Sequence, residues 1–343
     1  MEIPTIELAD QSAILRRLVD SVPLELELEH TQLRGGLEAA GVSQVAARYC
    51  DQAGRRRVFT CVIKRVAGAA ARELRVYRHV LASHAPSMAP RLLASHEPAT
   101  DSAVLYLELL RRTKAWPWGA LATARAVLEH VARLHMVELD PRGLEVLSDW
   151  NYESELGRNA ALTLERLEAA IRLPEFSALM ASVPPARRLL RSLPEIRRTL
   201  LAFDTLRRGP IHGDLHPGNA VVRRRNSRDE PVLIDWGRAR IGSPLEDISS
   251  WLHSLAEWEP EARRRHDSLF LSYLAARGME GRLRSDLRAA YWLAGASNAF
   301  SGGLLHHLTQ MLDQRATSRR RLRAAYSARQ WMRVLRRADA FWS

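Results

Sequence analysis

Three polar side chains between residues 211 and 237 have the types and spacing that phosphoryl transfer requires. Asp214 and Asn219 lie five positions apart, on either side of a Pro-Gly turn. Asp235 follows the apolar run at residues 232–234. In such a hairpin one carboxylate orients the attacking hydroxyl, while an amide and a second carboxylate hold the Mg²⁺ that bridges the nucleotide phosphates. We therefore expect Asp214 to act as the base, and Asn219 and Asp235 to bind the metal.

A simpler interpretation of these residues is a turn capped by Asp and Asn, followed by a strand that ends in Asp. His-Gly-Asp alone would not decide between the two interpretations. The five-residue spacing, the Pro-Gly turn and the apolar strand before Asp235 occur together here, and this combination favours a catalytic hairpin.

With these motifs the chain resembles the aminoglycoside phosphotransferase and choline kinase superfamily, the small-molecule relatives of protein kinases. The resemblance covers residues 35–251 and rests on residues 212–219 and 234–237, with Gly-Ser-Pro at 242–244. It implies that Asp214 is the catalytic base, that His212 helps to hold the catalytic loop, and that Asn219 and Asp235 bind Mg²⁺. It also implies that Asp247 braces this loop from the following helix.

A lysine and a glutamate in the N-terminal part fit the same chemistry. Lys64 ends a β-branched and aromatic run, and Glu73 lies nine positions later at the start of a helical pattern. Such a pair anchors the α- and β-phosphates of a nucleotide in kinases. Arg65 and Arg72 are the nearest competitors for this role.

Further nucleotide contacts are expected at two other places. The stretch 35–43 contains Gly35, Gly36 and Ser43, and glycines let backbone N–H groups approach phosphates closely. A simple hairpin explains this stretch equally well, and it is not a P-loop because it lacks a Gly-Lys-Ser/Thr end. The resemblance also implies that the adenine lies against backbone at Glu108 and Leu110.

The elements that must position these residues divide into two groups. Residues 1–108 show strand patterns at 24–28, 58–63 and 104–107 and one helical pattern at 69–82. Residues 109–343 are mainly helical, with an apolar stripe over 120–135, and the hairpin around Asp214 and Asp235 interrupts the helices. The predicted fold is α+β and protein-kinase-like. A small antiparallel sheet with one helix forms the nucleotide-binding lobe (1–108), and the helical catalytic and substrate-binding lobe follows (109–343).

Composition narrows the class of protein. No apolar run approaches the roughly 20 residues that span a bilayer, and the first residues do not resemble a signal peptide, so we expect a cytoplasmic protein. Cys50 and Cys61 are the only cysteines, which favours ordinary packing over a disulfide framework. The net charge of +12 comes almost entirely from arginines spread along the chain, so a nucleic-acid partner is not favoured.

The acceptor is expected to be a small molecule that carries a hydroxyl. Leu245 follows Asp235 by only ten positions, which leaves little room for a peptide-docking segment. Glu257, Glu259 and Glu261 near two tryptophans could line a pocket for a cationic substrate, although an exposed helix end is the simpler interpretation. The sequence leaves open the identity of the acceptor and the choice of ATP or GTP as donor. It also leaves an alternative function open, a catalytically silent module of the same fold that binds a nucleotide or docks a partner.

Overall fold

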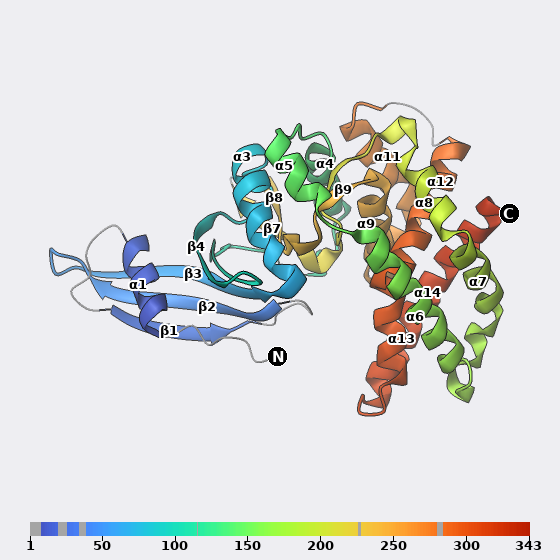
Figure 1. The fold of residues 1–343 in the computed structure, drawn as a ribbon, viewed down its shortest axis with the longest axis horizontal. Helices are drawn as coiled ribbons and strands as arrows, with labels where there is room; N and C mark the ends of the chain where they lie inside the picture. Colours follow the sequence, from blue (N-terminus) through green and yellow to red (C-terminus); the bar gives the residue numbers. More distant parts are fainter. Residues whose placement is uncertain (1–7, 20–25, 34–38, 115, 226–227, 280–283) are drawn as a thin grey trace. The chain divides into compact units, whose positions relative to one another are not determined.

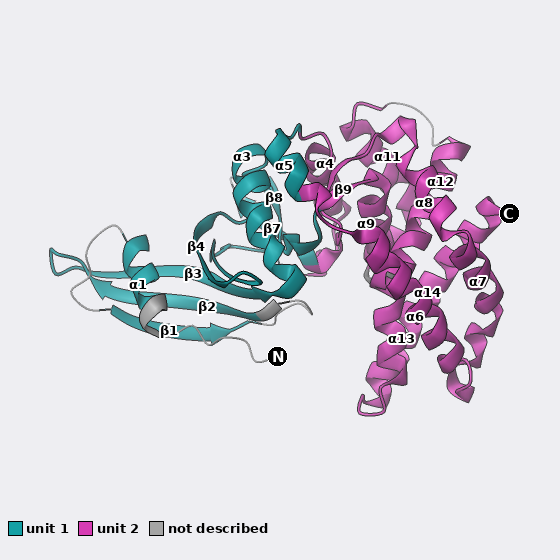
Figure 2. Cartoon of the chain, viewed as in Figure 1, with its two compact units in different colours: residues 1–114, 138–146, 219–239 teal, residues 115–137, 147–218, 240–343 magenta. Residues whose placement is uncertain are grey.

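The computed structural model describes residues 8–19, 26–33, 39–114, 116–225, 228–279 and 284–343. The chain forms two compact units (Figure 2). The first contains residues 1–114, 138–146 and 219–239, and the second contains residues 115–137, 147–218 and 240–343. Both units are discontinuous in sequence, whereas the sequence analysis placed a single boundary after residue 108. The predicted α+β class is confirmed, with an antiparallel sheet in the first unit and mainly helices in the second.

The first unit is built on a five-stranded antiparallel sheet (Figure 1) with the order β1-β2-β3-β5-β4. Its strands are β1 (Leu26–Gln32), β2 (Ala39–Cys50), β3 (Arg56–Ala67), β4 (Leu92–Ala99) and β5 (Ser102–Glu108). Three of them match the strand patterns in the sequence, and β2 and β4 had not been predicted. The central strand β3 is rich in β-branched and aromatic residues, which suits a strand paired on both sides.

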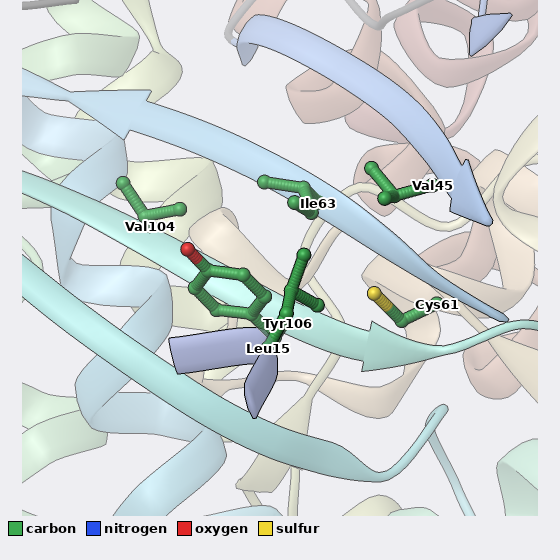
Figure 3. Packing of buried hydrophobic residues seen from close by; sticks show 6 residues of the cluster. All are labelled: Leu15, Val45, Cys61, Ile63, Val104 and Tyr106. Carbon is green, nitrogen blue, oxygen red and sulfur yellow. The ribbon is translucent and has the colours of Figure 1, made fainter. Parts of the chain in front are cut away.

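A helix that the sequence analysis missed, α1 (Leu8–Leu18), covers one face of this sheet (Figure 3). Leu15 packs on Val45 of β2, on Cys61 and Ile63 of β3, and on Tyr106 of β5. Side chains alternate between the two faces of a strand. Lys64, which follows Ile63, therefore lies on the opposite face of the sheet from α1.

The predicted helix after β3 is present but irregular. A 3₁₀ turn at Gly68–Arg72 leads into α2 (Glu73–Val76), a π-helical turn at Tyr77–Leu81 and α3 (Ala82–His84). The first unit is completed by α5 (Pro141–Ser148) up to residue 146 and by the hairpin of β7 (Ala220–Arg225) and β8 (Arg228–Leu233). This hairpin carries Asn219 and Asp235 at its two ends.

In its described residues, the second unit is helical apart from a short antiparallel pair, β6 (Gly209–Ile211) with β9 (Arg240–Gly242). Its helices are α4 (Leu121–Leu134), α6 (Tyr152–Ala170), α7 (Val183–Arg191), α8 (Leu193–Leu201), α9 (Pro244–Trp258), α10 (Pro260–Arg264), α11 (His266–Ala276), α12 (Ser285–Asn298), α13 (Leu304–Leu312) and α14 (Ser318–Trp342). The helix predicted at 120–135 is confirmed as α4. In the part of the chain that the structure describes, no helix has both the length and the apolar character needed to cross a membrane.

The packing role expected of Cys61 is confirmed. Cys61 is buried in the core cluster, where burial raises the pKa of its thiol to about 11. In α14, Met332 and Leu335 are buried, whereas Leu322 and Tyr326 are 62% and 45% exposed. In the first half of this helix, the buried positions include alanines such as Ala324 and Ala328.

Candidate active site

A buried ion triad joins β3, the start of α2 and the residue that follows the β7–β8 hairpin. Lys64 Nζ lies 2.6 Å from Glu73 Oε2 and 2.7 Å from Asp235 Oδ1. Lys64 pairs with Val42 and Leu105 on the neighbouring strands, so sheet register sets the direction of its side chain. Glu73 is only 1% exposed. The structure thus brings together the predicted lysine and glutamate, and it adds Asp235 to them.

The two carboxylates determine the charge state of Lys64. Burial alone would lower the pKa of its ammonium group, but Glu73 and Asp235 outweigh burial and raise this pKa above its usual value. Lys64 therefore stays protonated at neutral pH, as a partner for phosphate oxygens must.

The hairpin of β7 and β8 places Asn219 next to Asp235. Ala220 pairs with Leu233, and the backbone N–H of Ile234 donates to the Asn219 carbonyl at 2.9 Å. Asp235 then adopts a left-handed backbone conformation with φ of 67°, which is uncommon for a residue other than glycine. Such strained positions persist where the surroundings enforce them, often at functional sites.

The oxygen donors of Asn219 and Asp235 suit a hard divalent cation. The Asp235 side chain is 25% exposed, so its carboxylate is accessible to a ligand. Within the described residues, no group of three or more His, Cys, Asp or Glu side chains is arranged to hold a metal ion. A cation held by these two residues would complete its shell with phosphate oxygens and water, which is the usual setting of Mg²⁺ at nucleotide sites. The residues present therefore fit Mg²⁺ that arrives with a nucleotide.

In the second unit, Asp247 of α9 holds the loop that carries Asp214. Its Oδ2 accepts the backbone N–H of His212 at 2.7 Å, and its Oδ1 accepts that of Gly213 at 2.9 Å. His212 is fully buried, and its Nδ1 lies 3.4 Å from the donating backbone N of Asp214. Gly213 has φ of 80°, a conformation that glycine adopts readily. Asp247 is thus the brace that the resemblance implied, and His212 supports the loop from inside.

A buried histidine supports Asp247 in turn. His135 Nε2 lies 3.1 Å from Asp247 Oδ2, and His135 Nδ1 lies 2.8 Å from the hydroxyl of Tyr273. Burial lowers the pKa of His135 more than its hydrogen bond to Asp247 raises it. Burial alone would raise the pKa of Asp247, but the hydrogen bonds from His135 and the backbone hold it below its usual value. The pair is therefore a neutral imidazole hydrogen-bonded to a carboxylate.

Arg240 of β9 fixes the other side of the loop that carries Asp214. Its Nη1 donates to the Gly213 carbonyl at 3.2 Å. Arg240 also forms an ion pair with Glu246, which is bound by Arg197 at 2.9 Å. The Arg240 guanidinium stacks on Tyr152, with Cζ 3.7 Å from the ring centroid. These charged side chains are all buried, so the paired network leaves little freedom for the backbone before Asp214.

A hollow of about 430 Å³ lies in the first unit at the end of β5. Phe59, Glu108, Leu109 and Arg111 are among its lining residues. The Glu108 carboxylate forms an ion pair with Arg223 at 3.3 Å. Glu108 borders this hollow, whereas Leu110 is not part of its lining.

Of the predicted contacts in the stretch 35–43, the structure describes Ser43 and does not bring it to Lys64. Ser43 belongs to β2, not to a loop, and lies opposite Ile63 on the face that α1 covers. Because Lys64 is on the other face, the structure separates Ser43 from it. Gly35 and Gly36 lie outside the described residues.

The acids considered for a cationic-substrate pocket have local partners. Glu259 is 6% exposed, and its Oε1 accepts the backbone N–H groups of Trp118 and Gly119 at 3.2 and 3.3 Å. Glu261 pairs with Arg264 and Arg265 on the surface. The side chain of Glu257 lies outside the described set. The structure therefore favours the simpler interpretation, an exposed helix end, for Glu261, whereas Glu259 is a buried acid that binds backbone N–H groups.

The sequence analysis missed three residues that hold this machinery, namely Arg72, His135 and Arg240. Arg72 had been weighed only as a competitor of Lys64, but its guanidinium donates to backbone carbonyls. His135 ends the helical pattern of α4, and a polar residue that closes an apolar stripe is a weak signal. Arg240 has no local signature because its partners are distant in sequence.

The comparisons with known proteins agree with this geometry. A sequence model of the phosphotransferase enzyme family matches residues 38–294, which is more than half of the chain. No curated protein matches the chain. Similar solved structures include a choline kinase from Cryptosporidium parvum, with 13% identity, a TM-score of 0.57 and coverage of 96% of this chain and 95% of that one. An aminoglycoside phosphotransferase from Alicyclobacillus acidocaldarius has 15% identity, a TM-score of 0.54 and coverage of 99% and 96%.

Amicoumacin kinase, solved with AMP-PNP, Ca²⁺ and its ligand Ami, has 16% identity, a TM-score of 0.52 and coverage of 97% and 94%. At these identities the structural likeness establishes the fold, and it confirms the predicted kinase-like architecture. The family model and the fold lead to the same assignment, and the chain belongs to the phosphotransferase enzyme family.

Proposed function

We propose that this chain transfers the γ-phosphate of ATP or GTP, with Mg²⁺, to a hydroxyl group of a small molecule. The observation that carries the proposal is the triad in which Lys64 Nζ lies within 2.7 Å of both Glu73 and Asp235. Family membership supports phosphotransferase chemistry on small molecules. The AMP-PNP and Ca²⁺ bound to amicoumacin kinase support the use of a nucleotide with a divalent cation.

The nucleotide would bind on the face of the sheet that carries Lys64. Lys64 would pair with the α- and β-phosphates, while Glu73 keeps the ammonium group in place. Val42 pairs with Lys64, and Val62 points to the same face, so both lie next to this cation. Both valines are only half-buried and offer apolar surface to the base.

Asn219 and Asp235 would hold the divalent cation through their side-chain oxygens. When bound, Mg²⁺ bridges phosphate oxygens and offsets the charge that develops during transfer. The chain contributes the fixed donors, since hairpin register positions Asn219 and the left-handed backbone orients Asp235.

Asp214 would orient the acceptor hydroxyl and accept its proton. Its loop is held by Asp247 and Arg240, so the carboxylate does not need to be ordered when the acceptor arrives. The segment between Asp235 and Leu245 holds only a 3₁₀ turn at Trp236–Arg238 and the short strand β9. This short connection supports a small-molecule acceptor over a peptide.

The proposal is tested by incubating the purified protein with Mg²⁺, ATP or GTP and panels of aminoglycosides, amino alcohols and sugars. Mass spectrometry would report a phosphate-sized mass gain in the true acceptor. Asp214→Ala should lower kcat by about 10²- to 10⁴-fold while nucleotide affinity stays the same. Asp204→Ala, which removes an exposed acid of the same unit, is the matched control.

Wild-type turnover by Asp214→Ala would show that this residue is not the base. Nucleotide binding with no acceptor phosphorylated across the panels would favour the silent binding module instead. Absence of any thermal shift with nucleotide and Mg²⁺ would reject the nucleotide site itself.

A further inference from the structure

Arg72, the residue before Glu73, is buried against backbone carbonyls of the first unit. Its Nη1 donates to the carbonyls of Gly237 and Ala239 at 3.1 and 2.6 Å. Its Nη2 donates to the carbonyl of Val146 at 2.7 Å. Arg72 is only 8% exposed, so these bonds are shielded from water. A guanidinium placed in this way holds backbone segments in position, which differs from the role of a surface ion pair.

Two consecutive residues therefore hold the segment that follows Asp235. Glu73 Oε1 accepts the backbone N–H of Trp236 at 3.1 Å, while Arg72 binds the carbonyls two and four residues after Asp235. The segment forms the 3₁₀ turn Trp236–Arg238, and it begins directly after the left-handed Asp235. Arg72 and Glu73 together thus bind one backbone N–H group and two backbone carbonyl groups of residues 236–239.

The shape of the guanidinium explains why arginine stands here. Its planar fork presents several donors in fixed directions, and a lysine ammonium cannot span three separated carbonyls in the same way. Charge-assisted hydrogen bonds are also stronger than those between neutral groups. Such bonds can maintain the uncommon backbone conformation of Asp235, which by itself is unfavourable.

We propose that Arg72 is a positioning residue that holds the Asp235 carboxylate in the orientation needed for the divalent cation. The inference rests on the proposed function, because it assigns Asp235 to the metal. Arg72 touches neither metal nor nucleotide in this role. It acts through the backbone of residues 236–239, as groups that orient metal ligands commonly do.

The test compares Arg72→Met and Arg72→Lys with Arg78→Met as the matched control. Arg78 is an exposed arginine of the same irregular helix and pairs with Glu97 on the surface. Mn²⁺ affinity would be measured by electron paramagnetic resonance in the presence of a non-hydrolysable ATP analogue. Arg72→Met should weaken Mn²⁺ binding by about 10-fold or more, whereas the affinity for metal-free analogue and the Mn²⁺ affinity of Arg78→Met should match wild type.

Hydrogen exchange provides a readout that needs neither metal nor acceptor. The amides of Trp236 and Ala239 should exchange faster in Arg72→Met, since the segment that contains them loses its ties. Arg72→Lys keeps the charge and one of the bonds, so it should fall between wild type and Arg72→Met. It also keeps the test informative if Arg72→Met does not fold.

Wild-type Mn²⁺ affinity together with wild-type exchange in either folded Arg72 variant would overturn the positioning role. Failure of the wild-type protein to bind Mn²⁺ with the nucleotide analogue would instead overturn the proposed function, and the metal role of Arg72 with it. A loss of Mn²⁺ binding in Arg72→Met equal to that in Arg78→Met would also count against the inference, because it would show a nonspecific effect of losing a cation.

Discussion

Lys64 Nζ lies 2.7 Å from Asp235 Oδ1, so the lysine proposed to bind phosphate contacts the carboxylate proposed to bind metal. The two groups are 171 positions apart in sequence, and only the fold brings them together. Because Lys64 is shared with Glu73, it offsets only part of the negative charge of Asp235. A divalent cation that binds Asp235 must therefore compete with Lys64, and phosphate oxygens offer the lysine a replacement partner. Nucleotide and metal are expected to bind cooperatively for this reason.

Asp235→Asn keeps the size of this side chain and removes its charge. Affinity for the nucleotide in the presence of Mg²⁺ should fall by at least about 10-fold. Loss of a group that only supports a metal ligand already lowers metal affinity by about that factor, and Asp235 is proposed to be a ligand itself. Calorimetry with and without Mg²⁺ measures this effect. Asp229→Asn on β8 of the same hairpin, where Asp229 pairs with Lys114, is the control. Equal Mg²⁺-dependent affinities in wild type and Asp235→Asn would remove Asp235 from the metal site.

Lys64→Met should destabilise the protein as well as impair nucleotide binding. Glu73 is 1% exposed and would lose its nearest cation, and breaking a buried ion pair costs about 3–5 kcal/mol. The double variant Lys64→Met/Glu73→Gln should recover part of that loss, since glutamine can still accept the Trp236 N–H without a buried charge. Urea unfolding gives both free energies. A double variant no more stable than Lys64→Met would argue that the pair is not energetically coupled.

His135→Phe should loosen the loop that carries Asp214 from a distance. The variant removes the hydrogen bond to Asp247, and a hydrogen bond to a charged group contributes about 1.5–3 kcal/mol to stability. Because Asp247 holds His212 and Gly213, kcat should fall while the KM for nucleotide changes little. Steady-state kinetics with the acceptor and thermal unfolding measure the two effects. His30→Phe, at an exposed position of β1, is the control.

An unchanged kcat in a destabilised His135→Phe protein would limit this histidine to a role in folding. A raised KM for nucleotide with an unchanged kcat would be equally inconsistent with the expected route through Asp247.

The candidate hairpin around Asp214, Asn219 and Asp235 could be recognised from the sequence because its signals are local. Asp214 and Asn219 share one loop, and an apolar strand leads directly to Asp235, so their spacing already constrains the geometry. The pairing of Lys64 with Glu73 could also be predicted, because a strand and the helix that follows it are neighbours in most compact folds. In each case a few residues of chain determine the placement.

The supporting residues could not be predicted in this way. Arg72 binds carbonyls at positions 146, 237 and 239, and a carbonyl has no residue identity that a sequence pattern can reveal. Ser43 shows the opposite problem. A glycine-rich stretch suggested a loop, but strand pairing continues through Ser43, and the alternation of the strand turns it to the face opposite Lys64.

A histidine cluster in the second unit should make the protein sensitive to acid. His253 lies 5.2 Å from Trp292 and 5.9 Å from His266, measured between ring centroids, and His266 Nε2 lies 2.7 Å from the hydroxyl of Tyr291. Burial, with a smaller contribution from His266, lowers the pKa of His253 well below its ordinary value of 6.5. In the unfolded chain the ring takes up a proton near that ordinary value, so between the two pKa values the unfolded state binds more protons.

The free energy of unfolding should therefore be highest above pH 6.5 and should fall as the pH drops from 6.5 through the lowered pKa of the folded state. Each unit by which the pKa is lowered corresponds to about 1.4 kcal/mol. His253→Phe keeps an aromatic ring and removes the titration, so its urea unfolding free energy should change less between pH 7.5 and pH 5 than that of wild type. His30→Phe, which replaces an exposed histidine of β1, is the matched control. Identical pH profiles for wild type and His253→Phe would show that protonation of this cluster does not limit stability in acid.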